Sequence, residues 1–131
     1  MRKNRLTRVR ADGFTLIELL VVLAVVAMLV SLAVPRYFSS LEKSRESVLR
    51  YDLSVMRTAI DRYYGDLGVY PDSLQDLVDR KYLKGIPRDP ITEQTDSWIV
   101  EAPTDGGKGA VHDVHSGAPG QASDGTAYGQ W

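Results

Sequence analysis

The stretch FTLIELLVVLAVVAMLVSLAV, residues 14–34, decides the fold of this chain. Only Thr15, Glu18 and Ser31 among these 21 residues are polar. An α-helix of that length rises about 31 Å, which matches the hydrocarbon core of a bilayer. A charged side chain inside such a helix costs about 2.5–3.5 kcal/mol on insertion scales. The next basic residue, Arg36, lies about five helical turns beyond Glu18. The sequence therefore predicts a membrane-spanning helix whose carboxylate finds its partner charge elsewhere.

Basic residues are concentrated before this apolar run. Residues 1–13 carry five basic residues and one acidic residue, whereas the remainder carries 11 basic and 16 acidic residues. A basic flank before an apolar span places the N-terminus in the cytoplasm and the remainder outside. The acidic remainder argues against nucleic acid as the main partner, because phosphate binding needs clustered lysine and arginine. Without cysteines, the chain forms neither disulfides nor a thiolate metal site.

Two simple interpretations of the apolar run leave part of it unexplained. A secretory signal peptide would account for the basic flank and for a small-x-small cleavage site at residues 31–33. Its apolar core is usually only about 7–15 residues long, however, and would not contain Glu18. A plain membrane anchor explains the length of the run but not Glu18. A third interpretation is therefore favoured.

The stretch GFTLIE, residues 13–18, resembles the class III signal of type IV pilins and type II secretion pseudopilins. The resemblance implies that a prepilin peptidase cuts after Gly13 on the cytoplasmic side and methylates the new amine of Phe14. Glu18 is then the fifth residue of the mature chain, and Pro35 occupies a position where this family often has a helix-bending proline. In a filament, Glu18 of one subunit would pair with the Phe14 amine of its neighbour and fix the register. Glu18 is therefore expected to act in assembly and not in catalysis.

After Pro35 the helix is expected to continue in amphipathic form to residue 67. Apolar residues recur at spacings of three and four along one stripe: Leu49, Leu53, Met56, Ile60, Tyr63 and Leu67. The charged residues between them are expected to form a solvated face with opposite-charge pairs three and four apart: Glu42, Lys43, Arg45, Glu46, Arg50, Asp52, Arg57, Asp61 and Arg62. Because these charges are mixed in sign, packing of the apolar stripe against a small sheet is favoured over binding to a membrane surface.

The remaining residues predict a small head built from short elements. Gly65 and Gly68 are expected to stop the long helix. For a short helix at residues 74–78, two pairs have capping-box spacing, Asp72 with Gln75 and Ser73 with Asp76. The other expected parts are an extended turn at 68–71, a proline-rich loop at 82–90, a strand at 98–100, a turn at 105–109, a return strand at 110–115 and an irregular loop at 116–131.

This order of elements predicts an α+β, pilin-like fold. A long N-terminal helix would pack on a small antiparallel sheet, with an irregular C-terminal loop. The chain would consist of a leader at residues 1–13, a transmembrane half of the helix at 14–34, an amphipathic half at 35–67 and a head at 68–131. At 131 residues, the chain is long enough for one small domain.

The head also resembles that of the major pseudopilin family of type II secretion. The resemblance is carried by the Gly-x-Tyr-Pro turn at 68–71, by PRDP at 87–90 and by DVHS at 113–116. Type IV pilins often carry a C-terminal disulfide loop, which a chain without cysteines cannot form. The pseudopilin branch is therefore favoured.

The pseudopilin resemblance implies a calcium site in the C-terminal loop. Members of that family bind calcium there through aspartate side chains and main-chain carbonyls, the oxygen ligands that hard cations prefer. The residues of this chain that match are Asp113, Ser116, Ser123 and Asp124. Asp124 stands alone where paired acidic residues are expected, which predicts weaker binding. The alternative is a loop held by packing of Tyr128 and Trp131 against the sheet.

Other residues in the head have the types, but not the spacing, that catalysis or zinc binding requires. His112 and His115 suggest zinc, but residues three apart on a strand point to opposite faces. Ser116, His115 and Asp113 are the residue types of a catalytic triad, but neighbours along a chain seldom reach triad geometry. The sequence contains no phosphate-cradling glycine loop, G-x-S-x-G elbow or metalloprotease helix. We therefore expect no enzymatic activity.

The resemblance implies a structural role in the bacterial inner membrane, with one membrane pass, a cytoplasmic N-terminus and a periplasmic head. The chain would polymerise into the periplasmic pseudopilus of a type II secretion system. Its expected partners are further copies of itself, other pseudopilins, prepilin peptidase, an inner-membrane assembly platform and membrane lipid, while a separate ATPase would supply energy. Two alternatives stay open: a type IV pilus or competence pilin, and a membrane-tethered binding module that never polymerises.

Overall fold

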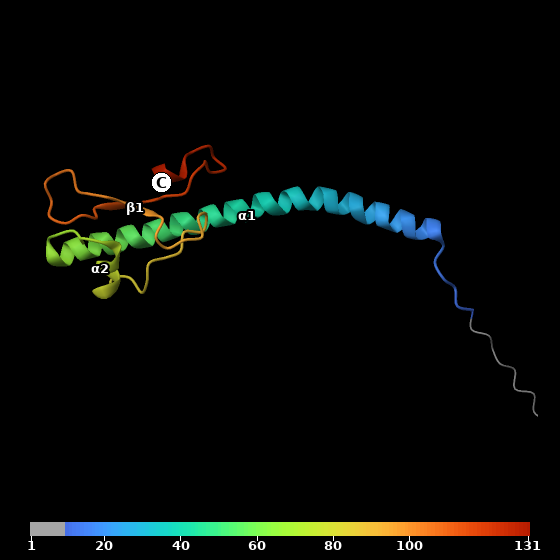
Figure 1. Ribbon diagram of the computed structural model, residues 1–131, viewed down its shortest axis with the longest axis horizontal. Helices are drawn as coiled ribbons and strands as arrows, with labels where there is room; N and C mark the ends of the chain where they lie inside the picture. Colours follow the sequence, from blue (N-terminus) through green and yellow to red (C-terminus); the bar gives the residue numbers. More distant parts are fainter. Residues whose placement is uncertain (1–9) are drawn as a thin grey trace, which may run out of the picture. The chain divides into compact units, whose positions relative to one another are not determined.

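The computed structural model describes residues 10–131 and divides into two compact units, the first ending at Phe38 and the second beginning at Ser39. Helix α1 (Leu16–Leu67) runs through both units (Figure 1). The first nine residues of the predicted leader lie outside the described residues, and residues 10–15 precede the helix. The Thr15 hydroxyl accepts a hydrogen bond from the Glu18 N–H at 3.2 Å, so it caps the first turn of α1.

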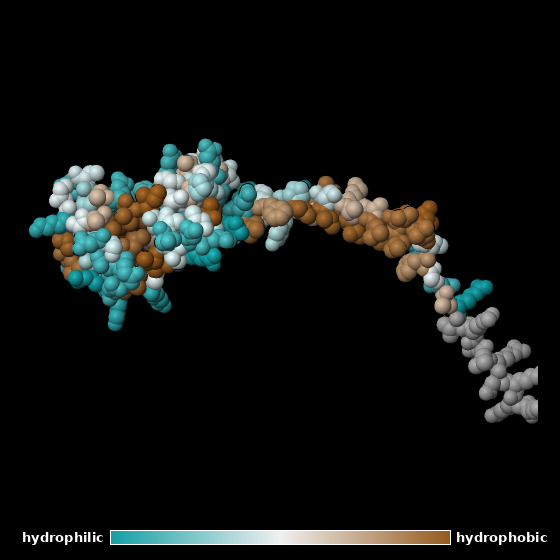
Figure 2. Space-filling model, in the orientation of Figure 1, coloured by the Kyte–Doolittle hydropathy of each residue, from teal (hydrophilic) through white to brown (hydrophobic). Residues whose placement is uncertain are grey.

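The first unit has no buried side chain among its described residues, 10–38. The long apolar side chains of this unit are exposed, and Figure 2 shows this surface in brown. Within the described residues, α1 is the one helix long and apolar enough to cross a membrane. The helix continues through Pro35, as predicted. The bend expected at that proline stays a prediction.

The second unit has one hydrophobic core, built on the apolar stripe of α1. The stripe buries Leu49, Leu53, Met56, Ala59, Ile60 and Tyr63 against Leu74, Leu77, Leu83, Trp98, Val111, Val114, Ala118, Ala122 and Tyr128. The predicted stripe is therefore confirmed up to Tyr63. Leu67 was wrongly included, because this last residue of α1 is 42% exposed.

The two glycines expected to stop α1 have different roles. Gly65 lies inside the helix, where a glycine costs about 1 kcal/mol relative to alanine but does not break the hydrogen-bond ladder. Gly68 follows the helix directly, has a φ of +69° and donates its N–H to the Tyr64 carbonyl at 2.8 Å. This left-handed conformation is the usual C-terminal cap of a helix. Only Gly68 therefore ends α1.

Helix α2 (Leu74–Asp79) begins with one of the two predicted capping boxes. The Ser73 hydroxyl accepts from the Asp76 N–H at 3.3 Å, and the Asp76 carboxylate accepts from the Ser73 N–H at 3.2 Å. The same carboxylate also accepts from the Asp72 N–H at 3.0 Å. The reciprocal bonds make Ser73 with Asp76 the capping box that forms, with Ser73 as the N-cap.

Strands β1 (Trp98–Glu101) and β2 (Asp113–Ser116) form an antiparallel pair in which Trp98 faces Ser116 and Glu101 faces Asp113. The return strand was predicted to begin at residue 110 but begins at Asp113. The preceding segment instead pairs with the turn after α1, since the N–H groups of Ala110 and Val111 both donate to the Pro71 carbonyl.

The C-terminal loop contains more structure than its composition indicates. A 3-10 helix, η1 (Tyr128–Gln130), follows an isolated bridge between Gln121 and Ala127. Tyr128 is buried, and its ring contacts the Trp131 ring edge-on at 5.4 Å between centroids. The expectation of an irregular loop was therefore wrong at these positions, because local hydrogen bonds fold the segment back on itself.

Candidate functional site

The predicted processing and assembly residues lie together at the start of α1. Gly13 precedes the helix, and no atom lies within 4 Å of the position that a side chain would occupy there. Phe14 is 84% exposed. Glu18 lies in the first helical turn, where the helix dipole favours a carboxylate. Within residues 10–131, Glu18 has no ion pair.

The chain is open around Gly13, while cleavage after Gly13 and methylation of Phe14 stay predictions. An open peptide bond after Gly13 is accessible to a protease, and cutting there leaves the apolar helix intact. The freed amine of Phe14 would lie four residues before Glu18 in the sequence. Pairing of that amine with the Glu18 of a neighbouring subunit stays a prediction, because it requires a second copy of the chain.

The four predicted calcium ligands point to four different partners. Asp113 accepts from the Arg57 Nε at 2.7 Å, and the Ser116 hydroxyl donates to Asp89 at 2.6 Å. The Ser123 hydroxyl donates to Glu46 at 2.6 Å. Asp124 accepts from Arg50 and from both the N–H and the hydroxyl of Thr126, at 3.0, 3.0 and 2.6 Å respectively.

The strand geometry explains why these oxygens do not converge. Asp113 and Ser116 are three residues apart on β2 and therefore lie on opposite faces, with Ser116 fully buried and Asp113 partly exposed. A calcium ion needs several oxygens around one point. The four residues, arranged as they are here, do not fit that requirement, and the calcium site stays a prediction.

Three charged side chains of α1 hold the C-terminal loop, and we call Glu46, Arg50 and Arg57 the loop anchors. Glu46 is buried and accepts from the Ser123 N–H at 2.7 Å and the Ser123 hydroxyl at 2.6 Å. The Arg50 guanidinium stacks on the Trp131 ring at 3.9 Å from its centroid.

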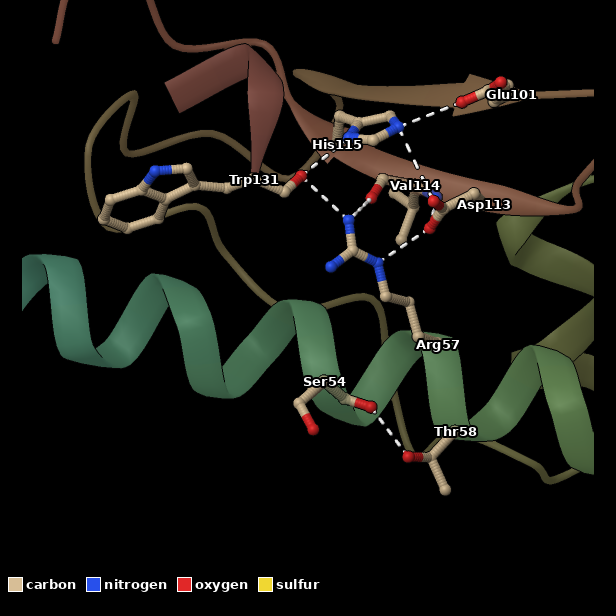
Figure 3. A network of polar contacts seen from close by, with 8 residues as sticks. All are labelled: Ser54, Arg57, Thr58, Glu101, Asp113, Val114, His115 and Trp131. Carbon is tan, nitrogen blue, oxygen red and sulfur yellow. Dashed lines mark hydrogen bonds and ion pairs between the residues drawn. The ribbon is translucent and has the colours of Figure 1, made fainter. Parts of the chain in front are cut away.

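Arg57 contacts three different residues (Figure 3). Its guanidinium donates to the carboxylate of Asp113 at 2.7 Å, to the carbonyl of Val114 at 2.9 Å and to the main-chain oxygen of Trp131 at 2.8 Å. One side chain of the helix thus joins strand β2 to the end of η1.

The expected solvated face with opposite-charge pairs along the helix is wrong in part: Glu46 is buried and Arg57 is half-buried, whereas Arg50 is exposed as predicted. The ion pairs within 4.0 Å that the described part of α1 makes join it to the head and not to other helical residues: Arg45 with Glu93, Arg50 with Asp124 and Arg57 with Asp113. The spacing of the three anchors in the sequence could have indicated their role. Positions 46, 50 and 57 are spaced by four and seven and therefore follow one border of the apolar stripe. A charged border next to a core is where a side chain can reach a segment packed on that core.

Three carboxylates at the attachment of the C-terminal loop, those of Glu46, Asp113 and Asp124, have lowered pKa values. The Ser123 hydroxyl is the main cause that lowers the pKa of Glu46, against the opposing effect of burial. Burial also opposes ionisation of Asp113, but the Val114 N–H and the Arg57 guanidinium outweigh it and lower its pKa. The Thr126 hydroxyl and N–H lower the pKa of Asp124. All three groups are therefore held in the charged form that the hydrogen bonds require.

A second cluster on the sheet was not predicted. The His115 Nε2 lies 3.1 Å from Glu101 and 3.7 Å from Asp113, and its Nδ1 lies 2.6 Å from the Trp131 oxygen. The residue types suit a metal ion, but both nitrogens of the His115 ring already contact protein oxygens. Ser116 faces away from His115, so Ser116, His115 and Asp113 do not form a catalytic triad.

Comparisons with known proteins agree with the arrangement at the start of α1. Residues 8–34 match the prokaryotic N-terminal methylation motif. The chain is 31% identical over 97 residues to type II secretion system core protein G of Aeromonas hydrophila, covering 62% of this chain and 68% of that protein. It is 29% identical over 149 aligned positions to core protein G of Vibrio cholerae, covering 100% and 96%.

Other relatives match over shorter stretches. Core protein G of Pseudomonas aeruginosa is 34% identical over 70 residues, and this chain spans about half of its length, 49%. The fimbrial protein EcpC of Eikenella corrodens is 37% identical over 59 residues, or 39% of that protein. No solved structure matches the chain. The methylation motif, the exposed apolar helix and the extent of the Aeromonas and Vibrio matches show that this chain belongs to the family of type II secretion system core protein G, the major pseudopilins.

Proposed function

We propose that the chain is a structural subunit that polymerises into the pseudopilus of a type II secretion system. Prepilin peptidase cleaves it after Gly13 and methylates Phe14. The apolar half of α1 first anchors the subunit in the inner membrane and then packs against other subunits in the filament. The head lies in the periplasm.

The observation that carries this proposal is Glu18. It is an exposed carboxylate in the first turn of a membrane-length helix, and it has no ion pair within residues 10–131. Such a group is costly in lipid unless a cation reaches it. The Phe14 amine of a neighbouring subunit supplies that cation at the same depth, so the pair favours assembly in one register.

The head supports the same role. Its core is closed by α1, α2 and the β1–β2 pair, so it forms a folded body that remains in water while the apolar helix is buried elsewhere. The expected partners of the chain are further copies of itself, other pseudopilins, prepilin peptidase and the inner-membrane assembly platform.

A type IV pilus subunit is the second candidate. The match to the fimbrial protein EcpC favours it, but that match covers 45% of this chain, whereas the Vibrio core protein G match covers all of it. Both candidates need the same processing at Gly13. They differ in whether the filament forms in the periplasm and restores secretion or extends from the cell surface.

Mass spectrometry of the membrane form tests the proposal. In cells that contain prepilin peptidase, we expect loss of residues 1–13 and a new N-terminus at N-methyl-Phe14. The same cells without the peptidase are the control and should keep the leader. An intact leader in both strains would indicate a tethered module that is never processed. A new N-terminus at Val34 would indicate a signal peptide, and either result contradicts the proposal.

A further inference from the structure

The C-terminal loop needs a source of order beyond its own hydrogen bonds. Between Gly117 and Trp131 the regular structure is one 3-10 turn and one isolated bridge. Fixing such a segment costs conformational entropy for every residue. The pseudopilin resemblance assigns that task to a bound calcium ion, yet the predicted ligands of this chain have other partners. The loop anchors of α1 are the contacts that join this segment to the long helix.

The Arg57 guanidinium donates hydrogen bonds to oxygens of the type that would bind a hard cation. Its guanidinium contacts one carboxylate oxygen, from Asp113, and two main-chain oxygens, from Val114 and Trp131, all within 2.9 Å. Carboxylate and carbonyl oxygens are the protein ligands that calcium prefers. The guanidinium is a permanent cation whose planar fork makes several directed hydrogen bonds at once. Figure 3 shows it reaching from α1 to the point where these oxygens meet.

Arg50 makes a second such contact. Its guanidinium donates to one Asp124 oxygen at 3.0 Å, while the Thr126 N–H and hydroxyl donate to the other. Both oxygens of the Asp124 carboxylate therefore have protein donors. The same guanidinium stacks on Trp131. A permanent cation from the helix thus neutralises the acidic residue that the sequence offers as the main calcium ligand of the loop.

Glu46 completes the attachment with the opposite charge. It is 8% exposed, and its two oxygens receive the N–H and hydroxyl of Ser123, with the Tyr128 hydroxyl at 3.4 Å. A buried carboxylate is costly unless donors surround it. The donors of the loop therefore stabilise the buried Glu46 carboxylate of α1, and Glu46 in turn holds the loop.

We propose that Arg57, together with Arg50 and Glu46, takes the place of a metal ion in holding the C-terminal loop, so that the head of this chain folds independently of calcium. The inference concerns the head alone. It stands whether or not the chain is processed and polymerises.

Unfolding of the full chain in detergent micelles tests the inference. Both tryptophans, Trp98 and Trp131, lie in the head, so their fluorescence follows the head and not the membrane helix. Thermal melts are recorded with about 5 mM calcium, above the roughly 0.1–1 mM dissociation constants of extracellular calcium modules, and with chelator. The variants are Arg57→Met, Arg57→Lys and, as the matched control, Arg62→Met. Arg62 is an exposed arginine of α1 that makes no ion pair within residues 10–131.

We expect the two wild-type curves to superimpose. Arg57→Met should lower the midpoint by roughly 5–10 °C, Arg57→Lys should lower it less because the charge remains, and Arg62→Met should leave it within about 2 °C. If Arg57→Met does not fold, the wild-type melts with calcium and with chelator, together with the Arg57→Lys midpoint, still test the inference.

Calcium itself can overturn the inference. A wild-type midpoint that rises by several degrees with calcium, and no longer rises in Asp124→Ala, would show that a metal holds the loop. Equal midpoints for Arg57→Met and Arg62→Met would show that Arg57 is not an anchor.

Discussion

The buried carboxylate of Asp89 should be one of the most sensitive positions in the head. It has no exposed surface. One of its oxygens accepts from the Ser116 hydroxyl at 2.6 Å, and the other accepts from the N–H groups of Ile91 and Thr92 at 2.8 and 3.3 Å. Ser116 in turn accepts from the Ala118 N–H at 3.1 Å. This chain of contacts ties the proline-rich loop to β2.

Asp89→Ala leaves three donors without their acceptor. A hydrogen bond to a charged group contributes about 1.5–3 kcal/mol, and a buried donor without a partner costs about 1–3 kcal/mol. Allowing for rearrangement of the loop, we expect the free energy of unfolding to fall by about 3–4 kcal/mol. Ser116→Ala removes one of these bonds and should cost about 2 kcal/mol. Asp89→Asn keeps an acceptor for Ile91 and Thr92 and should cost less than Asp89→Ala.

Tryptophan fluorescence during thermal unfolding of the full chain in micelles measures these differences. For a domain of 60–100 residues, 1 kcal/mol shifts the midpoint by about 4–8 °C, so Asp89→Ala should lower it by roughly 15 °C and Ser116→Ala by roughly 10 °C. Asp96→Ala, which removes an exposed carboxylate, is the control. An Asp89→Ala midpoint equal to that of Asp96→Ala would refute the reasoning.

Two further changes have expected outcomes in the same assay. Gly109→Ala should destabilise the head by more than about 2 kcal/mol, because the added carbon would lie 2.2 Å from the Tyr70 carbonyl oxygen. Gly106→Ala, also at positive φ but in open space, should cost only about 1 kcal/mol. Equal losses of stability in the two variants would contradict the steric argument. The ionised form of Glu46 contributes stability above its ordinary pKa of 4.5, and this contribution is lost as the pH falls through the lowered pKa of the folded state. Glu46→Gln should therefore be less stable than wild type at pH 7 and lose less stability on acidification, and parallel pH profiles would count against the Glu46 contacts.

The sequence predicted the parts of this fold that depend on local spacing. The apolar stripe of α1 follows the period of the helix, and the capping box at Ser73 and Asp76 is a pattern of four residues. The start of β2 was not predictable in this way. It depends on Pro71, whose carbonyl binds the N–H groups of residues 110 and 111 and so removes them from the strand.

The residues of the candidate site also differ in whether they could be predicted from local sequence. Gly13, Phe14 and Glu18 form a contiguous motif, so the sequence alone was sufficient to select them. The loop anchors were missed because Glu46 and Ser123 are 77 positions apart, and Arg57 and Trp131 are 74 apart. Periodicity shows which face of a helix is apolar, but it does not show which distant segment packs along the border of that face.

The pairing of Glu18 with a neighbouring subunit is the centre of this account, and chemical cross-linking of membranes tests it most directly. Glu18→Ala keeps Gly13 and the apolar span, so it should still be inserted and cleaved. Ser31→Ala is the matched control, because it removes another polar side chain of the span whose hydroxyl already bonds the Ala27 carbonyl at 2.8 Å. We predict ladders of multimers for wild type and Ser31→Ala and only monomers for Glu18→Ala. Equal ladders for all three would contradict the role of Glu18 in assembly.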